Sequence, residues 1–315
     1  METRAYAKIN LSLEIMGLRP DGYHEVRTIL QTIDLFDVLY FEPASRLEVE
    51  CSRPRLDGES NLAWKAATAL RQATGCDKGM TIRLEKHVPV GMGLGGGSSD
   101  AAATLNSLNA LWGLGLDDKE VHAIAATLGS DVPFFLSGGT ALGEGRGDVI
   151  TQLPPLGQRW IVLACPTAHY SSDGEETSGS ALNKTAHLYS MLSLKDHTDG
   201  NRTRNTVDAF SRGEFSQEVC YNAFDRVASS AFPGLDQARQ ELISAGAGRV
   251  SLSGSGPALY AMVPSKHEGE KVLKSLKKTG LKGYCVCTVS PSPNLAFSQS
   301  GQAARGSESS GTTDG

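Results

Sequence analysis

The sequence predicts an α+β protein of two domains in which helices pack against antiparallel sheet. Its 315 residues are enough for two separate cores. Strand patterns and helix patterns are mixed along the chain, which is typical of α+β proteins. The segment Leu153-Pro154-Pro155-Leu156-Gly157 has the prolines and the glycine of a linker. We therefore expect a first domain over residues 1–153 and a second domain over residues 158–289.

The first strand is predicted over residues 3–17, because apolar and polar residues alternate there. One face of this strand is expected to join the core, and a solvated surface is the ordinary interpretation of the other. The second face nevertheless brings the cation of Lys8 and the amide of Asn10 onto one surface. The core face carries Ala7, Ile9, Leu11, Leu13 and Ile15, and the opposite face carries Tyr6, Lys8, Asn10, Ser12 and Glu14.

A tight turn is predicted at Pro20-Asp21-Gly22. Tyr23 and His24 follow it directly, and their rings could stack on and hydrogen-bond to a flat ligand. By itself, this stretch indicates no more than a hairpin that carries two ring residues. The strand pattern returns over residues 26–41, and residues 43–58 are expected to form a polar connection.

Two helices and a strand are predicted next from their end signals. Asn61 is expected to cap a helix over residues 62–74, which Gly75 ends. Alternation predicts a strand over residues 80–84. Farther along, Asp117 has the spacing to Glu120 of a capping box, and the helix that it begins should end at Gly129.

The segment from Pro89 to Asp100 is the most informative part of the sequence. Its glycines, at positions 91, 93, 95, 96 and 97, let the backbone take positive φ and gather amide N–H groups into a concavity that suits an anion. Ser98 or Ser99 is expected to cap the helix that follows, and Gly113 to end it. A glycine loop before a helix N-terminus is the usual arrangement for holding a phosphate.

Three other interpretations of this glycine segment are weaker. The spacing Gly91-x-Gly93-x-x-Gly96 matches the dinucleotide fingerprint, but that pattern normally follows the first strand of its fold. A Walker A loop would need a lysine where Gly97 stands. A mobile glycine hinge would not explain the helix behind it.

Asp131 lies in the run Ser130-Asp131-Val132-Pro133 and allows two interpretations. It could cap a helix that has proline in its first turn. It could instead present a carboxylate at the loop–helix junction, where it would be available as a base. The segment from Phe134 to Gly147 then predicts a short apolar run and two close strands, or one strand and a turn.

The second half is predicted to begin with a buried strand over residues 160–165. A hairpin is expected over residues 248–262, around the small-residue turn Ser253-Gly254-Ser255-Gly256. A last strand is expected over residues 283–289, and a disordered tail rich in serine and glycine over residues 290–315. Helices are predicted over residues 181–194, 206–210, 220–229, 235–245 and 266–278.

Composition narrows the class of protein. The net charge is −5 without a basic cluster, which argues against nucleic acid or an anionic membrane as a partner. No apolar run is long enough to span a bilayer and the N-terminus has no signal-type segment, so we expect a cytoplasmic protein. The six cysteines include no C-x-x-C pair and are expected to be reduced and mostly buried.

Three of these stretches together resemble the motifs of the GHMP small-molecule kinases: Lys8-x-Asn10, Pro89-x-x-x-Gly93-Leu94-Gly95-Gly96-Gly97-Ser98-Ser99, and Ser253-Gly254-Ser255-Gly256. The resemblance spans about residues 3 to 289. It implies the two-domain GHMP kinase fold, with an ATP-binding N-terminal domain like ribosomal protein S5 domain 2 and a ferredoxin-like C-terminal domain.

Further runs resemble the members of this family that act on a cytidine diphosphate sugar alcohol: residues 7–11, 19–24 and 128–135. The resemblance implies transfer of the ATP γ-phosphate to the 2-hydroxyl of a methylerythritol moiety, in the non-mevalonate route to isoprenoids. Asp131 would accept the hydroxyl proton, while Lys8 would neutralise developing charge and hold Asp131 ionised. Mg²⁺ is expected, bound chiefly through ATP with possible help from Ser99 or Asp131.

The resemblance also implies binding residues. Asn10, Tyr23 and His24 would bind the small-molecule substrate, the last two at its cytosine end. Asn61 and Lys86 match positions near the adenine and the ribose. The phosphates of ATP would lie against Pro89, Val90, Gly91, Met92, Gly93, Leu94, Gly95, Gly96, Gly97, Ser98 and Ser99.

One segment departs from the family pattern. After the first strand of the second domain the family shows Ser-Thr followed by alanine and aromatic residues, but here Ser171-Ser172 precedes an acidic stretch. Substrate contacts are therefore not assigned to residues 166–180. The alternatives to a kinase are a non-catalytic binder of sugars or nucleotides with the same fold, and a nicotinamide dehydrogenase that rests on the glycine pattern alone.

Overall fold

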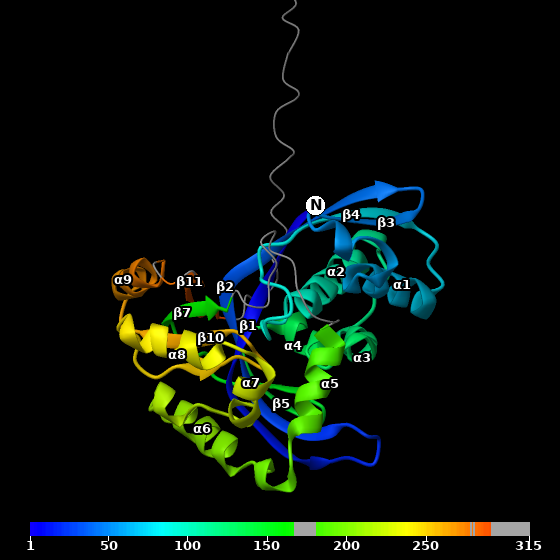
Figure 1. Ribbon diagram of the computed structural model, residues 1–315. Helices are drawn as coiled ribbons and strands as arrows, with labels where there is room; N and C mark the ends of the chain where they lie inside the picture. Colours follow the sequence, from blue (N-terminus) through cyan, green and yellow to red (C-terminus); the bar gives the residue numbers. More distant parts are fainter. Residues whose placement is uncertain (167–180, 278, 280, 291–315) are drawn as a thin grey trace, which may run out of the picture.

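The computed structural model describes residues 1–166, 181–277, 279 and 281–290. Within α5, the side chains of residues 181–183 are also left undescribed. The Ser171-Ser172 segment and the expected tail beyond residue 290 lie outside the described residues. Figure 1 shows the arrangement of the elements.

The first sheet is built around a long antiparallel hairpin of β1 and β2. Its strand order is β3-β4-β2-β1-β8, and β5 pairs with both β2 and β6. Two of its pairs are parallel, β3 with β4 and β1 with β8. The strands are β1 (Glu2–Leu18), β2 (His24–Ala44), β3 (Leu47–Cys51), β4 (Gly79–Glu85), β5 (Thr140–Glu144), β6 (Val149–Gln152) and β8 (Tyr221–Asn222).

Four helices form a core with part of this sheet. They are α1 (Leu62–Thr74), α2 (Gly96–Trp112), α3 (Asp118–Leu128) and α4 (Val132–Ser137). Asn61 caps α1 through its side chain and Gly75 ends the helix in the left-handed conformation, as the sequence predicts. The capping box of Asp117 and Glu120 at the start of α3 is also confirmed.

The second sheet has the strand order β11-β7-β10-β9. Its strands are β7 (Trp160–Cys165), β9 (Ser251–Leu252), β10 (Leu259–Val263) and β11 (Lys282–Cys287). The helices of this half are α5 (Ala181–Met191), α6 (Asn201–Ser211), α7 (Asp225–Ala231), α8 (Leu235–Ser244) and α9 (Lys266–Leu276). Short 3₁₀ turns lie at Pro54–Leu56, Gly58–Ser60, Leu194–Asp196 and Gln217–Val219.

The two sheets share a core, and this core positions the site. Ile9 of β1 and Leu163 of β7 belong to one buried cluster, together with Met92 and Leu94 of the glycine segment. The strand β8 joins the first sheet although it comes from the second half of the chain. Figure 1 shows β1 and β2 passing between the helices α1–α4 and the helices α6–α9.

Three local expectations are wrong. The polar face of β1 is not solvated, because Lys8, Asn10, Ser12 and Glu14 are all buried beneath other elements. Part of the expected polar connection is the strand β3, which gains its hydrogen bonds from the distant β4. The predicted helix over residues 220–229 begins only at Asp225, because Tyr221 and Asn222 pair with β1 instead.

Among the described residues, no helix is both long and apolar enough to cross a membrane.

Candidate active site

Lys8 and Asp131 face each other between β1 and the start of α4. The Lys8 Nζ lies 3.4 Å from the Asp131 Oδ2, and the two side chains are 4% and 38% exposed. Asp131 does not cap α4, since its backbone is already helical and its side chain accepts no capping hydrogen bond. The carboxylate is therefore half open to solvent and is held by the lysine.

A chain of hydrogen bonds fixes the ammonium of Lys8. Its Nζ donates to the Asn10 Oδ1 at 2.6 Å, and the Asn10 Nδ2 donates to the Thr28 Oγ1 at 2.8 Å. The Thr28 hydroxyl donates in turn to the Ser12 carbonyl at 2.6 Å. Asn10 accepts from Lys8 and donates to Thr28, so its amide is held in one orientation and can orient the Lys8 ammonium.

The glycine loop, which we define as residues 89–95, is fastened into the shared core by its apolar side chains. Met92 and Leu94 are almost fully buried. The intervening glycines at 91, 93 and 95 have φ values of 70°, 76° and 73°, a left-handed conformation that other residues rarely adopt. The alternation of glycine with buried apolar residues thus sets the path of the loop.

The carbonyl groups of residues 91–94 each accept a hydrogen bond from another element. Gly91 accepts from the Lys184 Nζ at 3.0 Å and Met92 from the Ala258 amide at 3.2 Å. Gly93 accepts from the Ser253 hydroxyl at 3.1 Å, and Leu94 from the Lys8 amide at 2.9 Å. The protein therefore occupies the carbonyl side of four successive peptide groups.

In a trans peptide the next residue's N–H points away from the carbonyl, so the N–H groups of residues 92–95 are turned to the opposite side. Among the described residues these N–H groups donate no hydrogen bond. Oriented, unpaired amide groups in a row form the kind of nest that binds an anion.

The helix α2 extends this row of amides. It begins at Gly96, and its N-cap is Gly95 in the left-handed conformation with no side-chain cap. The prediction that Ser98 or Ser99 caps α2 is therefore wrong, because the glycines let the chain enter the helix earlier. Without a cap, the N–H groups of residues 96–98 are left for a ligand, at the positive end of the helix dipole.

The second small-residue turn packs directly on the loop and on Lys8. A methyl group at Gly93 would collide with the Ser253 carbonyl oxygen. A methyl group at Gly254 would lie 3.0 Å from the Lys8 Nζ and 3.2 Å from the Asn10 Oδ1. Asn222 supports this turn by donating to the Gly254 carbonyl at 2.8 Å. The structure thus brings together three stretches that are distant in the sequence.

Lys86 lies beneath the first turn of α2 in a buried cluster of charges. Its ammonium pairs with the Asp37 carboxylate and lies 2.6 Å from the Asp100 Oδ2. Burial lowers the pKa of Lys86, but the two carboxylates outweigh burial and the net direction is upward. Burial raises the pKa of Asp100 to about 7 against the opposing charge of Lys86.

The other predicted adenine residue, Asn61, is engaged at the start of α1. Its Oδ1 accepts from the Ala63 amide at 2.8 Å, and its Nδ2 donates to the Leu56 carbonyl at 2.7 Å. The next residue, Leu62, would contact a methyl group placed on Gly97 at 3.3 Å. Asn61 is therefore next to a residue that lies near the start of α2 in space, but both ends of its own amide already have partners.

Tyr23 and His24 lie at the tip of the β1–β2 hairpin, away from the glycine loop. The His24 ring stacks on Tyr189 of α5, with ring centroids 4.6 Å apart and an interplanar angle of 20°. Burial, and then the nearby charge of His197, lowers the pKa of His24. Burial, and then the negative charge of Asp131, raises the pKa of Tyr189. Tyr189 of α5 therefore contacts the hairpin tip through its ring.

Sequence reasoning missed the contribution of α5. Besides Lys184 and Tyr189, this helix supplies Thr185, whose hydroxyl lies 3.1 Å from that of Ser255. The family pattern is Ser-Thr followed by alanine and aromatic residues, and Thr185, Ala186 and Tyr189 of α5 carry its last three residue types in that order. That partial match is the signal that could have found α5.

Comparisons with known proteins show the family and the fold. Residues 61–139 match the family model for the GHMP kinases N terminal domain, and residues 206–282 match that for the GHMP kinases C terminal domain. These matches confirm the predicted two-domain fold.

Curated relatives are similar over most of the chain. This chain is 39% identical over 287 residues to the 4-diphosphocytidyl-2-C-methyl-D-erythritol kinase of Dehalococcoides mccartyi, and the match covers 91% of this chain and 98% of the relative. It is 38% identical over 291 residues to the kinase of the same name from Symbiobacterium thermophilum, covering 92% and 100%.

Solved structures show the same relationship. A crystal structure of 4-(cytidine 5'-diphospho)-2C-methyl-D-erythritol kinase superposes with a TM-score of 0.74 at 32% identity, covering 91% of this chain and 99% of that chain. The crystal structure of L. major mevalonate kinase with R-mevalonate, at 18% identity and a TM-score of 0.66, shares the fold. The chain belongs to the GHMP kinase family, and within it to the 4-diphosphocytidyl-2-C-methyl-D-erythritol kinases.

Proposed function

We propose that this protein transfers the γ-phosphoryl group of ATP to the 2-hydroxyl of 4-diphosphocytidyl-2-C-methyl-D-erythritol, in isoprenoid synthesis. The observation that carries the proposal is the Lys8–Asp131 pair, with Nζ and Oδ2 3.4 Å apart, beside the glycine loop. The relatives' names support the substrate, and the half-open carboxylate supports a reaction with a hydroxyl at this point.

In the proposed step the substrate oxygen forms a bond to the γ-phosphorus while the bond from that phosphorus to the β-γ bridging oxygen breaks. Asp131 accepts the hydroxyl proton, and ADP leaves with the bridging oxygen. Because the transition state is loose and the proton departs late, Asp131 chiefly orients the hydroxyl. Lys8 lies where it can offset negative charge on the moving phosphoryl group.

The phosphates of ATP would occupy the row of amides over residues 92–98. The free N–H groups and the α2 dipole support this assignment, since both favour an anion. Asn61, at the start of α1, and Lys86, directly after β4 and paired with Asp100 of α2, would lie near the adenine and the ribose of the nucleotide. These roles are proposed for residues that are already hydrogen-bonded within the protein.

Mg²⁺ fits this arrangement as part of the ATP complex. The described residues contain no group of three or more side chains that could hold a metal by themselves. Mg²⁺ usually takes one or two carboxylates together with substrate phosphates. Asp131 is the half-open carboxylate that faces Lys8, so it would be the protein's ligand, whereas Ser99 is buried in α2. When bound, the ion would neutralise phosphate charge.

The cytosine end of the substrate would lie at the hairpin tip. Asn10 would contact the sugar alcohol near Lys8, and Tyr23 and His24 would contact the base. The flat faces of His24 and Tyr189 support a site for an aromatic ring. An alternative is a non-catalytic binder with the same fold, but such a binder would not need Lys8 and Asp131 to face each other.

The test is release of ADP by the purified protein with a panel of alcohols: the diphosphocytidyl compound, mevalonate, homoserine and galactose. We expect release with the diphosphocytidyl compound alone, and a new phosphate monoester on its 2-hydroxyl by ³¹P NMR. Release with a different alcohol would overturn the substrate assignment. ATP binding without ADP release from any alcohol would favour the non-catalytic alternative.

A further inference from the structure

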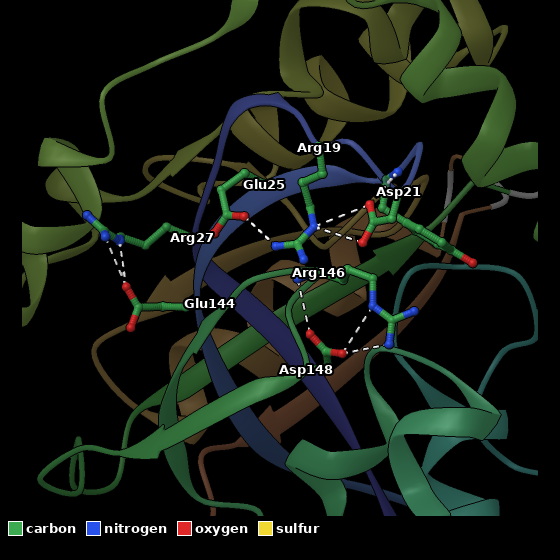
Figure 2. Close-up of polar contacts among 8 residues, drawn as sticks. Arg19, Asp21, Glu25, Arg27, Glu144, Arg146 and Asp148 are labelled. Atoms are coloured by element: carbon green, nitrogen blue, oxygen red, sulfur yellow. Dashed lines mark hydrogen bonds and ion pairs between the residues drawn. The ribbon is translucent and has the colours of Figure 1, made fainter. Parts of the chain in front are cut away.

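The turn between β5 and β6, residues 145–148, is packed against the tip of the β1–β2 hairpin. The Val26 amide donates to the Gly145 carbonyl at 2.7 Å, which fixes this turn close to His24. Figure 2 shows Arg146 and Asp148 of the turn beside Arg19 and Asp21 of the hairpin. None of the sequence motifs includes this turn.

Asp148 holds Arg146 in one orientation. The Arg146 Nη2 lies 2.7 Å and the Nε 3.1 Å from the Asp148 Oδ2. The Asp148 Oδ1 accepts from the backbone amide of Arg146 at 3.1 Å. Hydrogen bonding to Asp148, and then its charge, raises the pKa of Arg146. A guanidinium held at two nitrogens has a fixed plane.

Other arginines in the same region are engaged by other carboxylates. Arg19 pairs with Asp21 and with Glu25, and Arg27 pairs with Glu144 (Figure 2). Asp148 makes its ion pair with Arg146. Each of these arginines is paired with a carboxylate, and the guanidinium that lies over a neighbouring aromatic ring is that of Arg146.

That ring is Tyr23. The Arg146 Cζ lies 5.0 Å from the centroid of the Tyr23 ring. The Tyr23 backbone is fixed on both sides, because its amide donates to the Asp21 Oδ1 at 3.1 Å and its carbonyl accepts from the Arg19 amide at 2.7 Å. The side chain is 54% exposed, so little else restrains its rotamer.

We infer that Arg146, held by Asp148, is a positioning residue for the base of the cytidine substrate. Its guanidinium restrains the Tyr23 ring before the substrate binds, and so reduces the ordering cost of binding. This inference rests on the proposed function, since it assumes that Tyr23 contacts the base. It predicts an effect on recognition of the cytidine end and none on the phosphoryl transfer step.

The test compares Arg146→Met with Arg146→Lys and with a matched control. We expect the KM for the diphosphocytidyl substrate and the inhibition constant of CMP to rise together, by about two- to fivefold. The kcat and the KM for ATP should stay within about twofold. Arg146→Lys should not restore either constant, because an ammonium lacks the planar fork.

The control is Arg212→Met, because Arg212 also pairs with a carboxylate two residues later, at 2.7 Å from Glu214, and both are exposed. It should leave all constants unchanged. A wild-type protein that does not use the cytidine substrate would overturn the proposed function and this inference with it. Normal wild-type turnover with unchanged KM and CMP inhibition in Arg146→Met would overturn this inference alone.

Discussion

The two ends of the candidate site present different groups, backbone amides at one end and side chains at the other. At the phosphate end the protein offers backbone amides, and the carbonyls of residues 91–94 are all taken by other elements. At the proposed base end it offers side chains, the rings of Tyr23, His24 and Tyr189, with the partly buried Arg146–Asp148 ion pair against Tyr23. Lys8 and Asp131 lie between the two ends.

This difference indicates how each end should respond to mutation. A site made of backbone depends on conformation, so the loss of a glycine should harm it more than the loss of most side chains. A site made of rings depends on contact area, so each ring should contribute a moderate share of affinity. The following experiments are arranged to break or sharpen this contrast.

The largest effect on kcat is expected for Lys8 and Asp131, which lie between the two ends. Asp131→Asn and Lys8→Ala should each lower kcat by about 10²- to 10⁴-fold, because each removes a charge beside the reacting atoms. ATP binding, measured by calorimetry, should survive largely intact. Asp118→Asn, at an exposed position in α3, is the control and should keep full turnover. Near-normal kcat in either site variant would remove that residue from the mechanism.

The next largest effect is expected at the phosphate end. Gly93→Ala should lower kcat/KM for ATP by about tenfold or more, because its methyl group would strike the Ser253 carbonyl and lie 2.9 Å from the Gly256 nitrogen. Gly213→Ala is the control, since Gly213 has a similar φ of 72° with no atom within 4 Å of the added methyl. Equal losses in both variants would mean that backbone strain, and not displacement of the loop, is the cause.

A moderate effect is expected at the base end. His24→Ala removes the ring that stacks on Tyr189. The KM for the cytidine substrate should rise by about three- to tenfold while the KM for ATP stays constant. His187→Ala, exposed on the same helix as Tyr189, serves as control. An unchanged KM would place the cytosine elsewhere and would weaken the contrast between the two ends.

The smallest effect is expected on the pH dependence of stability, through the buried charges beneath α2. Burial raises the pKa of Asp100 from 3.8 to about 7, so between these values the folded protein keeps a proton that the unfolded chain releases. Unfolding free energy from this group therefore falls as pH rises through that interval. Asp100→Asn cannot titrate, so its stability relative to wild type should rise between about pH 4 and about pH 7 in urea unfolding. Parallel pH curves would contradict the assignment.

The sequence predicts much of the fold and most members of the site. End signals such as Asn61, Asp117 and Gly113 are local, and the structure places each at the helix end that it was expected to mark. Grouping Lys8, the glycine loop and Asp131 depended on resemblance to a family, because no local pattern connects residues so far apart.

What the sequence could not predict depends on distant partners. The strand β3 is defined by its pairing with β4, and the buried state of Lys86 by carboxylates from β2 and α2. The cap of α2 was misplaced because serine is the commoner N-cap, whereas Gly95 allows an earlier start. Lys184 was missed since a single lysine in a helix is ordinarily a solvated residue.

The hydrogen bonds to the loop carbonyls also determine whether the two halves of this chain can bind nucleotide as separate fragments. Three of the four donors, on Lys184, Ser253 and Ala258, lie beyond the linker, while the amides that they orient lie before it. A fragment ending at residue 153 would contain every glycine of the loop, but it would lack three of the four donors that hold the loop carbonyls. Cutting the gene at the linker should therefore abolish nucleotide capture, and co-expression of both pieces should recover it.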